Sequence, residues 1–230
     1  MKHLRILAVT GTFALLCLVG AGAAFAAGST VSVRVEGLKR TLLPATKVTA
    51  PSSGSITKGG TPAGTCPATN AAGPLNTATH GRWGGTYTTG LGIDITQILG
   101  ETHVFSSHGY YWEFFVNNRA ASLGVCDQKL RSGDRLLFAP APAKGTVYPI
   151  VLKTPARATA GTPFTVKAYY YPGSSNKTKP IAGVTFMGLS GSTNKSGVAT
   201  LTGSHSGKLK LVGSDKGYIR SAASTVEVSG

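Results

Sequence analysis

The sequence has little negative charge. Eight Asp and Glu stand against 23 Lys and Arg among its 230 residues, which gives a formal net charge of +15. An excess of this size attracts polyanions over long distances. The basic residues are scattered: no run is longer than two, and no interleaving with aromatic residues marks a nucleic-acid groove. The composition therefore indicates either a general attraction to anionic polymers or a solvated cationic surface without a dedicated partner, and it argues against specific nucleic-acid recognition.

Residue sets that could catalyse a reaction are also missing. The sequence contains no Gly-x-Ser-x-Gly elbow and no phosphate-binding glycine loop. Asp127 and Asp134 lie close together, but capping of a turn explains Asp134. Glu101, His103 and His108 form a local group that could bind a metal, yet their spacing matches no ligand motif. We expect these three to be polar surface residues, and we predict a protein without a catalytic site, metal or cofactor.

Cysteine is scarce, and the first of the three residues, Cys17, lies in an apolar N-terminal run. Neither Cys66 nor Cys126 has a second Cys or His at the spacing of a zinc site. Because an isolated pair in an oxidising compartment most often bonds to itself, we predict a Cys66–Cys126 disulfide rather than a thiol nucleophile or two metal ligands. Closing this loop of about 60 residues stabilises a fold by about 4 kcal/mol in the chain-entropy model.

Long apolar runs are confined to the start of the chain. Residues 1–26 combine a basic start, an apolar run over 6–19 and a small-x-small motif ending at Ala26, which is the layout of a secretory signal peptide. We predict cleavage after Ala26, which leaves 204 residues with a net charge of +13. The alternative is an uncleaved membrane anchor, because residues 6–27 carry no charge. The leader predicts a secreted protein, extracellular or associated with the cell envelope.

Helix signals are almost absent. Short apolar runs alternate with Gly, Pro, Asn and Ser, which is typical of a mainly β protein. Residues 31–36 alternate with period two and predict a strand, and residues 36–43 predict a turn into a second strand. The polar stretch 51–82 is long for a loop, so we expect one short helix at 70–79 inside it, with Cys66 pinning it to the body.

The aromatic residues concentrate around residues 110–116. Alternation along this segment predicts a strand with aromatic side chains on both faces. Asn117 and Asn118 can adopt the positive φ angles of a tight hairpin turn. A Ser-Gly-Asp turn then leads into a strand in which Leu136 and Phe138 point inward. The segment is expected to form the centre of a compact domain.

A change of pattern divides the chain into two predicted domains. Residues 141–148 are rich in Pro, Ala and Gly and are typical of a linker. Residues 27–140 precede this linker and form the first predicted domain. Residues 149–230 contain seven short strand segments separated by turn signals every 8 to 12 residues, which is typical of a small β-sandwich.

Three segments of the first domain share a pattern with a known family: VSVRVEG at 31–37, YYWEFFVNN at 110–118 and LRSGDRLLF at 130–138. On these segments, residues 29–140 resemble the family named after the C-terminal domain of transcobalamin, although Asn118 stands in place of its turn glycine. The resemblance implies a β-grasp-like α+β fold, a curved sheet packed on one helix. It transfers no ligand residue, because transcobalamin covers cobalamin with this domain beside a large helical domain that has no counterpart here.

The second domain contains PIAGVTF, STNKSGVATLT and STVEV. On these segments, residues 147–230 resemble the bacterial immunoglobulin-like repeat domains of surface proteins, with their Pro-x-x-Gly-(Ala/Val)-x-Val and Thr-(Asn/Asp)-x-x-Gly-x-Ala patterns. The resemblance implies an immunoglobulin-like β-sandwich that serves as a spacer or as an adhesive module.

The aromatic strand supplies the candidate ligand-binding residues, because its aromatic side chains exceed what one face of a small core needs. One face should pack on the helix. The other is either covered by the long loop or exposed as a stacking surface for sugar or another apolar ligand. The candidate residues are Trp83, Tyr111, Trp112 and Phe115.

These observations predict a secreted or cell-envelope-associated, non-catalytic binding or display protein that anionic cell-wall polymers or glycans retain through its positive charge. The alternative is a small-molecule or glycan binder that uses the aromatic face of the first domain, with a corrinoid as one guess by resemblance. A membrane becomes a partner only if the leader stays uncleaved.

Overall fold

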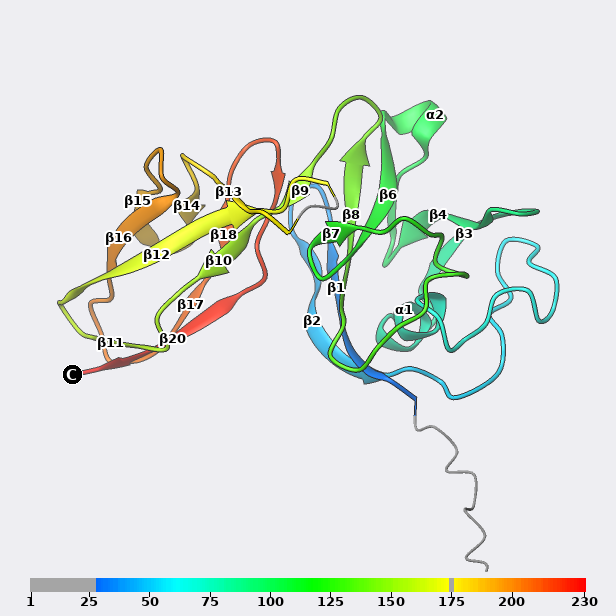
Figure 1. Cartoon of the computed structure of the whole chain (residues 1–230), viewed down its shortest axis with the longest axis horizontal. Helices are drawn as coiled ribbons and strands as arrows, with labels where there is room; N and C mark the ends of the chain where they lie inside the picture. The colour runs from blue at the N-terminus through cyan, green and yellow to red at the C-terminus, as the bar shows by residue number, and fades with distance from the viewer. Residues whose placement is uncertain (1–27, 174–175) are drawn as a thin grey trace, which may run out of the picture.

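The computed structural model describes residues 28–173 and 176–230, and this part of the chain is mainly β, as predicted. Two bodies lie side by side, each around a hydrophobic core of its own (Figure 1). We call residues 28–142 the first module and residues 147–230 the second module. The predicted signal peptide, residues 1–26, lies outside the described residues.

The first module is built on a five-stranded sheet with the order β2-β1-β8-β6-β7. The two central strands, β1 and β8, are parallel, and the other neighbours are antiparallel. Val31, Val33 and Val35 alternate along β1 into the core, as their period predicts. The strands are β1 (Thr30–Glu36), β2 (Thr41–Thr49), β6 (Tyr110–Val116), β7 (Arg119–Ala120) and β8 (Arg135–Pro142).

One face of this sheet packs on a helix and on a smaller sheet. The helix, α1 (Ala72–Ala78), buries Leu75 and lies inside the segment in which a helix is predicted. The smaller sheet has the order β3-β4-β5 and adds Ile93, Ile95 and Ile98 to the same core. Its strands are β3 (Trp83–Thr88), β4 (Gly92–Ile98) and β5 (Glu101–Thr102), and a short helix, α2 (Phe105–His108), leads into β6.

The hairpin between β6 and β7 confirms the predicted turn. Asn117 and Asn118 have φ angles of 53° and 66°, and they join Val116 to its partner Arg119. The side chain of Asn117 donates from Nδ2 to Oδ1 of Asp134 at 2.8 Å and accepts the N–H of Arg135 at 3.0 Å. Asparagine tolerates the left-handed conformation, so both central residues of this turn can be asparagine rather than glycine.

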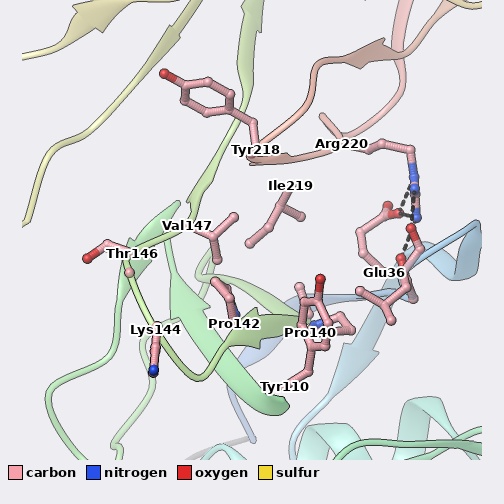
Figure 2. A pocket seen from close by; sticks show the side chains of 15 residues that line it. Glu36, Tyr110, Pro140, Pro142, Lys144, Thr146, Val147, Tyr218, Ile219 and Arg220 are labelled. Carbon is pink, nitrogen blue, oxygen red and sulfur yellow. Dashed lines mark hydrogen bonds and ion pairs between the residues drawn. The ribbon is translucent and has the colours of Figure 1, made fainter. Parts of the chain in front are cut away.

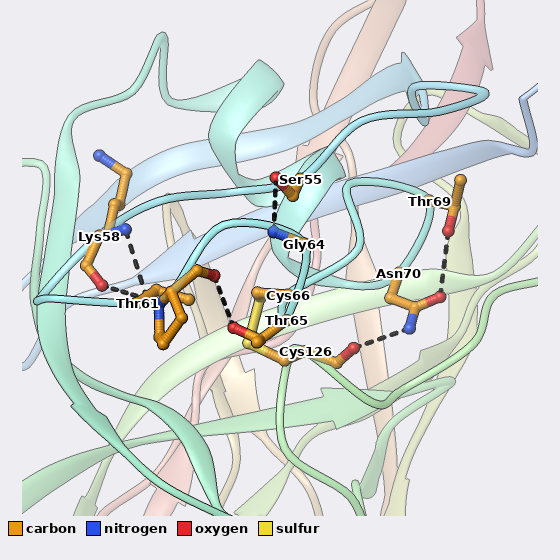
Figure 3. Close-up of a disulfide and its surroundings, with 10 residues drawn as sticks. Ser55, Lys58, Thr61, Gly64, Thr65, Cys66, Thr69, Asn70 and Cys126 are labelled. Atoms are coloured by element: carbon orange, nitrogen blue, oxygen red, sulfur yellow. Dashed lines mark hydrogen bonds between the residues drawn. A yellow bond between two sulfur atoms is a disulfide. The ribbon is translucent and has the colours of Figure 1, made fainter.

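The long polar segment is held to the module by the disulfide, as predicted. Cys66 and Cys126 are bonded and buried, with their Cα atoms 4.5 Å apart (Figure 3). Asn70 donates from Nδ2 to the carbonyl of Cys126 at 2.7 Å, which adds a second tie next to the bond. Gly73 follows in α1, where a Cβ would collide with the carbonyl oxygen of Ala68. The loop therefore has fixed backbone contacts although its composition is polar.

The second module consists of small sheets around one core. Each of the seven predicted strand segments contains a strand. The first sheet joins β10 (Val151–Lys153), β12 (Pro163–Tyr170), β13 (Lys179–Pro180) and β16 (Val198–Thr202). The second sheet joins β11 (Arg157–Thr159), β20 (Ser224–Ser229) and β17 (Gly207–Leu211). The third sheet joins β15 (Leu189–Ser192), β14 (Thr185–Phe186) and β18 (Gly213–Ser214).

Alternation along the strands builds the core of the second module. Val166 and Ala168 of β12 point inward, and Val226 and Val228 of β20 meet them in the same cluster. Lys167 lies between Val166 and Ala168 and points outward. The inner face is therefore apolar and the outer face polar, as expected for a sheet with one face in water.

The predicted linker at 141–148 is wrong in part. Ala141 and Pro142 complete β8, where Ala141 pairs with Tyr111 of β6. Further on, β9 (Tyr148–Pro149) pairs in parallel with β19 (Tyr218–Ile219) of the second module. Proline is tolerated in β8 because β1 pairs with this strand only as far as residue 138, so the missing N–H groups face no neighbouring strand.

The second face of the large sheet is covered by the second module and not by the long loop, so that expectation is wrong. Phe115 of β6 and Leu137, Ala139 and Ala141 of β8 form one buried cluster with Val147 and Ile219. The second module therefore shields apolar residues that a single-faced sheet would expose to water. The two modules share an apolar contact between their cores.

Candidate functional site

The four aromatic candidates lie in different places. Trp83 and Trp112 belong to the core of the first module, and Phe115 belongs to the cluster between the modules. Their exposed fractions are 4%, 6% and 1%, whereas Tyr111 is half-buried. An open stacking surface is therefore wrong for Trp83, Trp112 and Phe115. Trp112 and Phe115 lie on opposite faces of β6 and pack in two different clusters, and Trp83 of β3 packs in the same core as Trp112.

Tyr111 and Trp112 do meet at one groove. It has a volume of about 480 Å³ and lies between β6 and the hairpin of β3 and β4, where Leu91 is 74% exposed. Trp112 contributes little surface to it, and its Nε1 is enclosed without a hydrogen-bond partner in the described part of the chain. The groove thus brings together two of the four predicted residues, and neither Trp83 nor Phe115 lines it.

Glu113 borders the same groove and is half-buried. Burial raises the pKa of its carboxyl above the ordinary value, although a hydrogen bond from the Tyr111 hydroxyl at 3.5 Å acts the other way. The raised pKa means that the folded state holds the proton more tightly than the unfolded chain. The contribution of protonated Glu113 to stability is complete below the pKa of about 4.3 that the carboxyl has in the unfolded chain. This contribution is lost as the pH rises through the pKa of Glu113 in the folded state.

We expect Glu113→Gln, which cannot ionise, to remove this loss. The free energy of unfolding of the variant, relative to that of the parent protein, should therefore be higher at pH 7 than at pH 4. Urea unfolding at both pH values measures the difference, and Glu227→Gln, at an exposed position, serves as the control. Identical pH slopes for Glu113→Gln and the parent would contradict the assignment.

The half-buried Glu101 pairs with the buried His103, so the expectation of surface residues is wrong for His103. Nε2 of His103 lies 2.7 Å from Oε1 of Glu101, His103 is 5% exposed, and its ring centroid lies 5.1 Å from that of Trp112. The N–H of Leu38 donates to the same carboxylate oxygen at 2.8 Å. The side chain of His108 is not among those described.

Neither Glu101 nor His103 lines the groove beside β6 or either of the two openings between the modules that are described below. No group of three or more His, Cys, Asp and Glu side chains suited to a metal ion is found in residues 28–173 and 176–230. The pair ties the segment after β4 to the turn between β1 and β2.

A cavity of about 260 Å³ lies where the two modules meet (Figure 2). Tyr110, Pro140 and Pro142 of the first module form one side. Val147 and Ile219 point toward them from the second module, as Figure 2 shows. Both polypeptide stretches are needed to close this cavity, so sequence reasoning on either domain alone missed it.

Three charged residues form an ion cluster at this boundary. Glu36 of β1 is 2% exposed and lies 2.7 Å from Nη1 of Arg34 and 3.0 Å from Nη2 of Arg220 in the second module. Arg220 also donates to the carbonyls of Gly37 and Leu38 (2.6 and 3.3 Å), and Arg34 donates to the carbonyl of Arg220 at 2.9 Å. The ion cluster therefore joins the modules through charge-assisted hydrogen bonds.

Burial and ion pairing act in opposite directions on Arg34 of the ion cluster. Desolvation lowers the pKa of Arg34, and the nearby Glu36 carboxylate opposes this shift. Alternation along β1 places Arg34 and Glu36 opposite the valines, a position that predicts exposure to water. Opposite charges two residues apart on one face of a strand are the signal that could have indicated pairing, but the partner Arg220 is 184 residues further along.

Comparison with known proteins gives no family. No protein-family model matches the chain, and no curated protein sequence matches it. A crystal structure from Ruminococcus gnavus ATCC 29149, described as that of a candidate metal-binding protein, matches half of this chain and 99% of its own, with 13% identity and a TM-score of 0.36. A likeness this weak carries no argument about fold or function. Within the described residues, no helix is long and apolar enough to span a membrane.

Proposed function

We propose that this chain is a secreted or cell-envelope-associated, non-catalytic binding or display protein, retained by anionic wall polymers or glycans. The observation that carries the proposal is the charge of the folded part. Residues 28–173 and 176–230 hold 21 Lys and Arg and only eight Asp and Glu. Eight carboxylates cannot neutralise so many cations, so a strong positive field remains around the protein. The Cys66–Cys126 disulfide supports export, because such bonds persist in oxidising compartments.

The acidic residues are also used in ways that leave the surface basic. Glu36 is enclosed and takes part in two ion pairs, while the exposed pair of Lys208 and Glu227 is separated by 3.9 Å. The second module carries ten Lys and Arg against Asp215 and Glu227. The larger share of the unbalanced charge therefore lies on the second module, and this module should make most of the electrostatic contacts with the wall.

Salt should release the protein from cells. At 1 M NaCl the Debye length is about 3 Å, so attraction between exposed charges is screened. We expect washing of producing cells with 1 M NaCl to move most of the retained protein into the supernatant. Iso-osmotic sucrose should leave it on the cells, and protein found only in the medium at low salt would contradict retention.

We further propose that the two modules are those that the sequence resembles. For residues 29–140, a β-grasp-like fold is supported by the curved five-stranded sheet with parallel central strands and with α1 on one face. For residues 147–230, an immunoglobulin-like sandwich is supported by sheets that share one core between β12 and β20. Such modules display or space binding surfaces and need no catalytic group.

A second candidate is a small-molecule or glycan binder, and the cavity between the modules favours it. Its volume of about 260 Å³ lies just below the range of typical ligand pockets, which suits a small ligand better than a corrinoid macrocycle. Tyr110 and Val147 supply apolar surface and Lys144 supplies a charge. Titration with soluble glycans and with cobalamin, followed by the emission of Trp83 and Trp112, separates this candidate from display alone.

A further inference from the structure

A second opening between the modules, which we call the basic cleft, has a volume of about 220 Å³. Both of its charged lining residues are arginines, Arg34 of β1 and Arg135 of β8, and no Asp or Glu is among the described residues that line it. Ser32, Asn118 and Ser224 add hydroxyl and amide groups. A narrow opening with charge of one sign and several hydrogen-bonding groups is suited to an anion.

Arg34 is a built part of the basic cleft. The residue is 5% exposed, and its Nη1 is occupied by Glu36 and by the carbonyl of Arg220. Within the described residues, Nε and Nη2 of Arg34 make no hydrogen bond. Neither atom is fully enclosed, because among these residues the fully buried side-chain nitrogen or oxygen without a partner is Nε1 of Trp112. The three N–H groups on these two nitrogens therefore still touch open space. A buried guanidinium with unused donors is costly unless a ligand or water accepts from it.

Arg135 lies on the neighbouring strand and on the same face of the sheet. The register pairs Ser32 with Arg135, and Arg34 follows Ser32 by two residues, so all three side chains project toward the second module. Two guanidinium groups that project from the same face of neighbouring strands can both donate to one tetrahedral oxyanion, which offers more acceptor oxygens than a carboxylate.

Beside the basic cleft, two arginines of the first module flank a pair of tyrosines of the second module. The guanidinium of Arg119 lies 4.1 Å from the ring centroid of Tyr171, which packs at 5.8 Å against Tyr169. Burial raises the pKa of Tyr169 above its ordinary value, and the charge of the nearby Arg135 acts in the opposite direction. The first module supplies the arginines and the second the tyrosines, so this arrangement exists only in the folded chain. It provides further surface for the neighbouring units of a polymer.

We propose that the basic cleft binds a phosphate group, with Arg34 and Arg135 donating to its oxygens, as the anchoring site for a phosphate-bearing wall polymer. This inference rests on the proposed function and deepens it, because it names the chemical group that a polymer would present. Arg34 is held in place by Glu36, and Arg135 closes on the ligand from the exposed side.

Titration of the secreted protein with inorganic phosphate at constant ionic strength tests the site. We expect saturable changes in the amide resonances of Ser32, Arg135 and Ser224, and weaker changes with acetate. Arg135→Gln should weaken phosphate binding by about tenfold, the effect of losing a charge-assisted hydrogen bond. Arg131→Gln removes the same charge from a neighbouring exposed position outside the basic cleft and should change binding by less than about twofold.

Several results would overturn the site. These are changes that do not saturate, changes spread evenly over the surface, or equal losses in the Arg131 and Arg135 variants, because each describes general attraction to a basic protein. Thermal melting of both variants checks that the fold is retained. A soluble poly(glycerol phosphate) oligomer, compared with inorganic phosphate, distinguishes a polymer from a free ion: tighter binding of the oligomer supports the polymer, and equal binding contradicts it.

The two proposals fail separately. Binding of phosphate in the basic cleft by a protein that cells release at low salt would refute retention and leave the site intact. Retention on cells that Arg135→Gln does not weaken, combined with no phosphate binding in solution, would refute the site and leave retention intact. The cell-washing experiment and the titration therefore answer different questions.

Discussion

Glu36→Gln is expected to lower the free energy of unfolding by about 3 kcal/mol or more. The substitution removes the one carboxylate that pairs with Arg34 and Arg220, and Glu36 itself is 2% exposed. Removing one partner of a buried ion pair is more damaging than the pair is stabilising, because the remaining charge stays in a poorly solvated place. Urea unfolding at pH 7 measures the loss.

Glu227→Gln is the matched control for this variant. Glu227 is also a strand residue with a basic partner, Lys208, but the two side chains are 53% and 74% exposed and 3.9 Å apart. An exposed pair contributes about 0–1 kcal/mol, so the control should remain close to the parent protein. Equal losses for the two glutamates would mean that the ion cluster does not hold the modules together.

Removal of the disulfide is expected to have an effect of similar size. Cys66 and Cys126 close a loop with a sequence separation of 60, and the chain-entropy model gives about 4 kcal/mol for a loop of this length. We expect the double variant Cys66→Ala, Cys126→Ala to lose about this amount in urea unfolding. The loop of residues 51–71 should become the first region to exchange its amide hydrogens, since the bond and Asn70 tie it to residue 126.

Reduction of the parent protein provides the control. A reductant should destabilise the parent to about the level of the double variant and should leave the double variant unchanged. A loss below about 1 kcal/mol in the variant would show that the hydrogen bonds of the loop suffice without the covalent link. Free thiols in the purified protein would contradict the bond directly.

Local features were predictable from the sequence because they depend on near neighbours. Alternating valines predict β1, and the Asn117–Asn118 turn follows from the backbone angles that asparagine tolerates. Asp134 accepts the N–H of Arg131 at 2.8 Å, as capping of a Ser-Gly-Asp turn requires. The disulfide followed from the count and spacing of the cysteines.

The errors share one cause. Pro142 favoured a linker, but proline fits a strand whose N–H side has no neighbour. Glu101 and His103 looked like loop residues, yet folding brings Trp112 and Leu38 against them. In each case the environment of the residue comes from segments distant in sequence, which periodicity cannot report.

The sequence by itself determined the mainly β class, the positions of most strands, the disulfide and the positive charge, because hydrophobic period, turn chemistry, cysteine count and net charge are properties of the chain. Only the tertiary structure decided that Arg34 and Glu36 are buried, that Phe115 faces another core, and that Arg135 borders a cleft. The physical reason is the docking of the second module. It covers a face of the sheet that the alternating pattern alone assigns to water.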